Sequence, residues 1–222
     1  HAGGAAEAFI DAHPDNFRAY RLRGIAALDA EDLPKAAEVF ERASELPGSD
    51  PWDAEQWVGA HLRAEQPDEA ALAAEACIER FRESIACYAY AAALADESRS
   101  EDDALPTRVA AIQRLARMTS GDRRAIARAG AVLRDYGSET HVQTYVHAVA
   151  DLRPNNVSSL MQAGWVAHFA ELPDLAVAMM ERVLAVDDAN FDALNYIGYE
   201  WADRGINLEQ AEVYIREALF LR

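Results

Sequence analysis

The stretch Asn190–Leu219, NFDALNYIGYEWADRGINLEQAEVYIREAL, decides the fold of this chain. Its first half has a glycine, Gly198, among bulky apolar residues, and its second half carries the small or apolar series Ala211, Ile215 and Ala218. Spacings of four and then three residues place such a series on one face of a helix. The stretch therefore predicts two amphipathic helices joined by a short turn.

The same pattern recurs upstream. Gly164, in MQAGWVAH, and Gly130, in ARAGAVLR, precede Gly198 at equal intervals of about 34 residues. Further toward the N-terminus the small position falls at Ala92, Val58 and Gly24. Only the interval between Ala92 and Gly130 is longer than the others. A period of this length is the signature of a repeat protein, so we predict an array of helix pairs.

The second helix of each pair carries its own small and apolar markers. These are Ala36, Phe40 and Ala43; Ala70, Ala74 and Cys77; and Ala176, Met180 and Val183. A glycine in the first helix, facing its partner, lets the two antiparallel helices of a unit approach closely, whereas a larger side chain would push them apart. We therefore predict a structural role for Gly24, Gly130, Gly164 and Gly198.

With this unit length, the small residue in the first helix and the alanines in the second, the chain resembles the tetratricopeptide repeat (TPR) family. Pro14 and Pro154 also match the proline that ends a unit in that family. The resemblance covers nearly the whole chain. It implies an all-α, right-handed superhelical solenoid of antiparallel helix pairs, with about six repeats plus a leading partial one.

The period also predicts the boundaries of the units. Residues 1–14 are expected to be the second helix of a truncated preceding repeat, followed by units 15–48, 49–82, 83–119, 120–154, 155–188 and 189–222. The unit at 83–119 would take its extra residues in a long, acidic, exposed loop at 96–106. Because the pattern is cut at both ends, we expect the sequence to be part of a longer protein.

The composition bears on the partner. The formal net charge is −17, from 38 acidic and 21 basic residues. Such a surface repels nucleic-acid phosphates and anionic lipid heads, so neither is an expected partner. No apolar run is long enough to predict direct membrane insertion, and no targeting signal is present in these residues. The compartment, bacterial cytoplasm or periplasm, stays open.

Catalytic and metal-binding motifs are missing from the sequence. HExxH, GxSxG, a phosphate-binding glycine loop and clustered CxxC are all absent. The six histidines, at positions 1, 13, 61, 141, 147 and 168, do not share the spacing of metal ligands. We therefore predict no enzyme activity, no metal and no cofactor.

The two cysteines allow two interpretations. Cys77 lies near the end of one predicted helix and Cys87 near the start of the next, so in an antiparallel pair they could face each other. A disulfide between them would indicate an oxidising compartment. Alternatively, both are small buried apolar residues, since Cys77 occupies the position of Ala43 and Ala218 in other units.

In the TPR family, function usually resides on a concave surface lined by the first helix of each unit. The resemblance implies that this groove contains Arg18, Arg21, Arg124, Arg134, Met161, Trp165, His168, Phe169, Asn195 and Tyr199. Aromatic and methionine side chains with arginines suit an extended or helical peptide that has apolar anchors and an acidic group. Alternatively, Trp165 and Tyr199 simply pack between neighbouring units.

Two functions follow from this interpretation. The first is a non-enzymatic scaffold that binds another protein or peptide in the groove, within a bacterial multiprotein assembly; the last unit looks like those of bacterial cell-envelope repeat proteins. The second is the substrate-recruiting or regulatory arm of an enzyme whose catalytic domain lies outside these residues. Exposed end repeats would also allow self-association.

Overall fold

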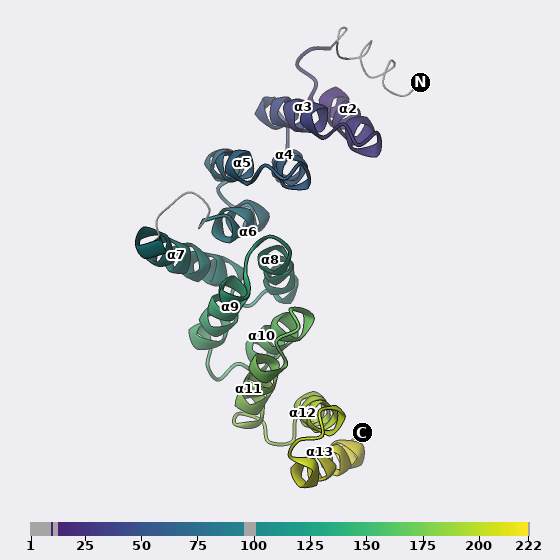
Figure 1. Cartoon of the computed structure of the whole chain (residues 1–222), viewed down its shortest axis with the longest axis vertical. Coiled ribbons are helices and arrows are strands. Elements are labelled where there is room, and N and C mark those ends of the chain that lie inside the picture. Colours follow the sequence, from purple (N-terminus) through teal and green to yellow (C-terminus); the bar gives the residue numbers. More distant parts are fainter. Residues whose placement is uncertain (1–9, 11–12, 96–100, 222) are drawn as a thin grey trace. The chain divides into compact units, whose positions relative to one another are not determined.

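The computed structural model describes Ile10, residues 13–95 and residues 101–221 (Figure 1). Within these residues every regular element is an α-helix, which confirms the predicted all-α, TPR-like class. None of these helices is both long and apolar enough to cross a membrane. The chain divides into two compact units, residues 1–111 (unit 1) and residues 112–222 (unit 2). Each of these is larger than a single repeat and is described by itself.

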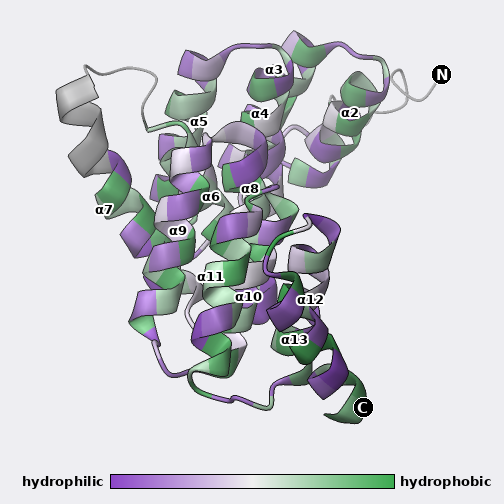
Figure 2. Cartoon of the chain, turned by 60° about the horizontal axis from the view of Figure 1, so that its bottom comes forward, coloured by the Kyte–Doolittle hydropathy of each residue, from purple (hydrophilic) through white to green (hydrophobic). Residues whose placement is uncertain are grey.

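Helices follow one another along both units. Unit 1 contains α2 (Phe17–Asp29), α3 (Leu33–Glu45), α4 (Pro51–Arg63), α5 (Pro67–Arg80), α6 (Ile85–Ala93) and the first part of α7 (Glu101–Thr119). Unit 2 contains the rest of α7, α8 (Arg123–Tyr136), α9 (Glu139–Leu152), α10 (Val157–Phe169), α11 (Pro173–Leu184), α12 (Phe191–Asp203) and α13 (Leu208–Leu221). Figure 2 shows hydrophobic and hydrophilic residues interleaved along the helices, as amphipathic packing requires.

The first helix of each pair begins at a polar cap. The caps are Asn16, Asp50, Ser84, Asp122, Asn156 and Asn190, and each side chain accepts a backbone N–H from the first turn of its helix. Such caps satisfy donors that have no partner inside the helix. The caps are equally spaced except for the longer interval between Ser84 and Asp122, so they repeat with the same single interruption as the small residues.

The turns inside several pairs share one backbone feature. Glu31, Glu65, Glu171 and Asn207 have φ values of 56°, 56°, 59° and 48°, in the left-handed region. A residue in this conformation ends a helix and reverses the chain within a few residues. The next helix then starts at once, and α3, α5 and α11 have a proline in the first turn, where the missing N–H costs nothing.

The predicted acidic loop at 96–106 is wrong in its second half, because α7 already begins at Glu101. Residues 96–100 lie outside the described part of the chain. Three successive acidic residues, at 101–103, are well suited to a first helical turn, since the helix dipole favours negative charge there. The extra residues of this repeat therefore lengthen a helix as well as its connection.

The repeat glycines lie at close helix contacts. A Cβ added at Gly24 would lie 2.7 Å from the ring of Phe40, and one at Gly164 would lie 2.7 Å from Cε of Met180, each on the second helix of the same pair. At Gly198 the nearest atoms belong to Ile215 and to the backbone of α13.

Gly130 differs from the expectation. Its missing Cβ would lie 2.6 Å from Val166 on α10, which is the first helix of the next repeat and not the partner of α8. This glycine therefore allows α8 and α10 to approach each other.

Cys77 on α5 and Cys87 on α6 form a disulfide, with their Cα atoms 5.5 Å apart. Both residues are fully buried, beside Ala54 of α4. The structure thus combines the two interpretations of the sequence, because the cysteines are both bridged and packed as small apolar residues. The bond ties the second repeat to the third.

Candidate functional site

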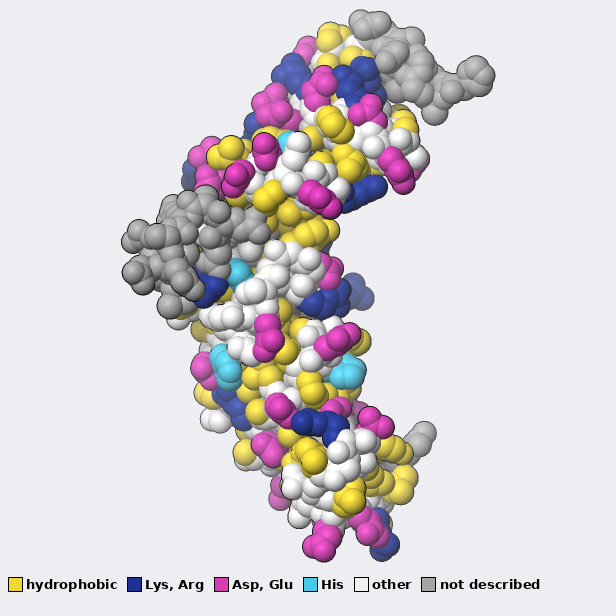
Figure 3. Space-filling model, viewed as in Figure 1, with side chains coloured by type: hydrophobic (Ala, Val, Ile, Leu, Met, Phe, Trp, Pro, Cys, Tyr) yellow, Lys and Arg dark blue, Asp and Glu magenta, His cyan; other side chains and the backbone are white. Residues whose placement is uncertain are grey.

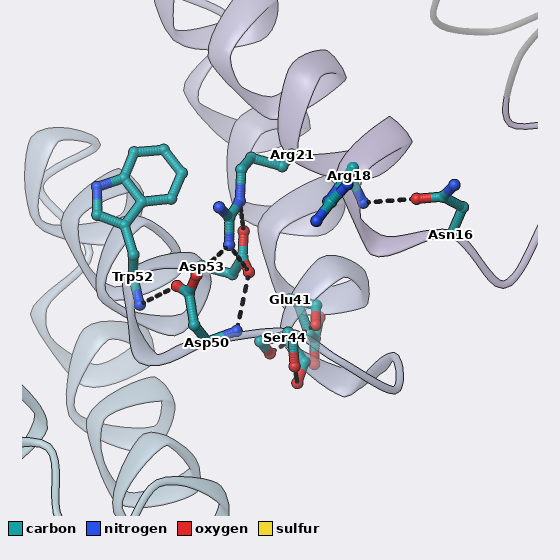
Figure 4. A network of polar contacts seen from close by, with 9 residues as sticks. Asn16, Arg18, Arg21, Glu41, Ser44, Asp50, Trp52 and Asp53 are labelled. Carbon is teal, nitrogen blue, oxygen red and sulfur yellow. Dashed lines mark hydrogen bonds and ion pairs between the residues drawn. The ribbon is translucent and has the colours of Figure 1, made fainter.

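In unit 1, the predicted groove residue Arg21 is occupied by contacts within the protein (Figure 4). Its Nε and Nη2 atoms donate to the two carboxylate oxygens of Asp53 at 2.7 and 2.6 Å, and Nη2 also donates to Asp50 at 2.8 Å. The guanidinium also lies 5.1 Å from the ring centres of Phe17 and Trp52. The hydrogen bond to Asp53, followed by that to Asp50, raises the pKa of Arg21 above its ordinary value.

Arg21 therefore links α2 to α4, the first helices of adjacent repeats. The Asp53 side chain is fully buried, so the guanidinium neutralises a carboxylate that water does not reach. Arg18, one turn earlier, is exposed, and its guanidinium lies 5.7 Å from the Phe17 ring centre. Of the two predicted arginines of α2, only Arg18 remains accessible to a ligand.

In unit 2, a hollow of about 400 Å³ lies between α8 and α10, and we call it the trough. It is lined by Arg123, Ala127, Gly130, Ala131 and Arg134 from α8, and by Gln162, Trp165, Val166 and Phe169 from α10. Both sets follow spacings of three and four residues, so each is a single helix face. We call the three small lining residues of α8 the floor and the lining pair Trp165 and Phe169 the aromatic wall. The close contact of Gly130 with Val166 brings the two helices together.

Three of the predicted groove residues line the trough: Arg134, Trp165 and Phe169. Phe169 is 65% exposed, and Trp165 is half-buried. The Nε of Arg134 donates to the carboxylate of the adjacent Asp135 at 2.6 Å, and this hydrogen bond raises the pKa of Arg134.

Two predicted residues of unit 2 do not line the trough. Arg124 is exposed, but the neighbouring Arg123 takes the lining position, seven residues before Gly130. Met161 is buried in the core. It lies three residues before Gly164, on the helix side that packs against α11, so the prediction that it lines a groove is wrong.

His168, another predicted residue, takes part in a second contact, between α10 and α12. Tyr196, which the sequence analysis missed, packs edge-on against Trp165 and His168, with ring centres 5.5 Å apart in both cases. Its hydroxyl and Nδ1 of the exposed His168 are hydrogen-bonded at 3.2 Å. Burial raises the pKa of Tyr196 to about 12. Trp165 therefore both lines the trough and packs between neighbouring repeats.

Asn195 and Tyr199, on either side of Tyr196 in α12, do not line the trough. Asn195 is half-buried, whereas Tyr199 is 60% exposed. Among the residues that the structure describes, no three histidine, cysteine or acidic side chains gather as metal ligands would. Figure 3 shows acidic side chains distributed over the visible face, in keeping with the net charge of −17.

No family model matches the chain, and no curated protein matches it. Solved structures do. The chain is similar to YrrB, described as a TPR protein with an unusual peptide-binding site, at 16% identity over 87% of this chain and 97% of that one, with a TM-score of 0.44. It is also similar to the C-terminal part of a TPR protein from Cytophaga hutchinsonii, at 15% identity over 99% and 88% of the chains, with a TM-score of 0.47.

A third similar structure is TTC0263, a TPR protein of Thermus thermophilus, at 15% identity over 93% of this chain and 91% of that one, with a TM-score of 0.36. At these identities the similarities leave the ligand open. The assignment of the fold rests on the helix pairs, caps and glycine contacts of the chain itself.

Proposed function

We propose that this chain is a non-enzymatic interaction scaffold that binds a segment of another protein in the trough of unit 2, within a bacterial multiprotein assembly. The observation that carries the proposal is the trough itself. It is a hollow of about 400 Å³ with a floor of small residues, an aromatic wall and an arginine toward either end of its α8 face. Ligand sites in proteins are typically hollows of this kind, mostly apolar with a few polar groups.

The aromatic wall favours a protein partner. Large aromatic side chains and arginines contribute much of the binding energy at protein interfaces, provided that a partner can cover them. Phe169 is well placed for this role, because 65% of its side chain is exposed at the end of the wall. The substrate-recruiting arm of an enzyme would use the same trough, so the alternative function shares this site.

The apolar surface of α13 supports self-association as a second mode of interaction. A hollow of about 730 Å³ lies along α13, lined in part by Leu184, Leu194 and Phe220. Of these lining residues, Phe220 is 91% exposed. A second copy of the chain would cover this apolar surface.

A capture experiment with matched variants tests the trough. The tagged chain is used as bait in a lysate of the organism that encodes it, beside Phe169→Ala and Tyr199→Ala. These two side chains are similarly exposed, at 65% and 60%, but only Phe169 lines the trough. We expect Phe169→Ala to reduce capture by roughly tenfold or more, as for an interface anchor, and Tyr199→Ala to retain it.

Circular dichroism of both variants checks that the helices are intact. Equal loss from the two variants would contradict a site confined to the trough, and undiminished capture by Phe169→Ala would remove the aromatic wall from the interface. Recovery of the untagged chain itself would report self-association.

A further inference from the structure

We infer that the trough binds an acidic segment whose carboxylates lie about 16 Å apart, on either side of a large apolar side chain. This inference rests on the proposed function and adds the chemistry of the partner. Three properties of the trough support it: the charges of its lining, the spacing of its arginines and the apolar space between them.

The lining has a charge opposite to that of the chain. The protein has 38 acidic residues in 222, yet none of the residues that line the trough is acidic, and two are arginines. The acidic side chains of the protein therefore repel an acidic segment, whereas the two arginines of the trough attract it. Electrostatic complementarity of this kind chooses the partner and its orientation.

The arginines have donors available for such a segment. Arg123 is exposed and makes no ion pair with the other described residues. Arg134 uses Nε for Asp135, and its two terminal nitrogens remain available to a ligand carboxylate. Because both groups are exposed, their attraction for a carboxylate will weaken as salt is added.

The positions of the arginines give the length of the segment. Arg123 and Arg134 are eleven residues apart on one face of α8, which corresponds to about 16 Å along the helix axis. An extended chain advances about 3.3 Å per residue, so about five residues span this distance. Acidic side chains near both ends of the segment would then reach the two arginines.

The volume suits one large apolar side chain of the segment. The trough holds about 400 Å³, and its small α8 residues Ala127, Gly130 and Ala131 leave that space open. Trp165 and Phe169 would flank that side chain.

The test uses a random heptapeptide library displayed on phage, selected against the whole chain. We expect the selected peptides to carry Asp or Glu on both sides of an aromatic or large aliphatic residue. A selected peptide, synthesised with amidated and acetylated ends, should bind Arg123→Glu, Arg134→Glu about tenfold more weakly than the unmodified chain, since each reversal replaces attraction by repulsion. Added sodium chloride should weaken binding to the unmodified chain.

A charge-matched control, Arg63→Glu, Arg124→Glu, changes two exposed arginines outside the trough and should retain the affinity. Selection of peptides without an acidic preference, whose binding is lost with Phe169→Ala but not with the arginine reversal, would overturn the inference and leave the proposed function standing. Selection of basic peptides, equal effects of the two double variants, or no selected peptide at all would also overturn it.

Discussion

Replacing Gly198 by leucine is expected to lower the free energy of unfolding by about 3 kcal/mol, near the upper end of the usual cost of overpacking a core. A Cβ at this position would lie 2.7 Å from Ile215 Cγ1, 3.1 Å from the carbonyl oxygen of Ala211 and 3.2 Å from the backbone nitrogen of Ile215. Two of these atoms belong to the backbone of α13 and cannot turn aside as a side chain can. The larger residue therefore forces α12 and α13 apart.

Gly59→Leu is the matched control, because it makes the same substitution inside helix α4 where a Cβ would meet no atom within 4 Å. Leucine favours the helix over glycine, so this variant should gain about 0.5–1 kcal/mol of stability. Urea denaturation followed by circular dichroism measures both variants. Similar losses at the two positions would show that the helix contact at Gly198 is not the cause.

Arg21→Ala is the second large effect, with an expected loss of about 3 kcal/mol in the free energy of unfolding, because it leaves a buried charge without its partner. The Asp53 carboxylate is fully buried and receives two hydrogen bonds from this guanidinium. The substitution also removes the guanidinium from its place beside Phe17 and Trp52. Urea denaturation again gives the measurement.

Two further variants isolate the cause. Arg18→Ala removes an exposed arginine from the same helix and should change stability by no more than about 0.5 kcal/mol. Adding Asp53→Asn to Arg21→Ala removes the unpaired charge and should recover part of the loss. If the double variant is no more stable than Arg21→Ala, the buried carboxylate is not the source of the effect.

The helix pairs could be predicted from the sequence because their signals repeat. The small residues and the polar caps return with the same period and the same single longer interval, and the second-helix apolar series follows them except for one extra residue in the last repeat. Agreement among signals of different physical origin identifies a fold more reliably than any one of them. The start of α7 was missed because acidic residues are compatible with both an exposed loop and a first helical turn.

Groove residues were harder to predict, because one residue along a helix turns the side chain by about 100°. That rotation separates Arg123, which lines the trough, from the predicted Arg124. Contacts between residues that are distant in the sequence could not be predicted for another reason. Nothing in the sequence near Arg21 indicates that its guanidinium donates hydrogen bonds to Asp53, 32 residues later. Likewise, the packing of Tyr196 against Trp165 depends on how one repeat follows another.

The claim that a partner binds the first helices of the repeats can be tested most directly by site-specific photo-crosslinking. Benzoylphenylalanine is placed either at Phe169, at the end of first helix α10, or at Leu72, on second helix α5; these side chains are 65% and 67% exposed. Irradiation in the lysate is expected to link a partner protein to position 169 and not to position 72. Adducts of equal yield at both positions, or adducts only at position 72, would contradict it.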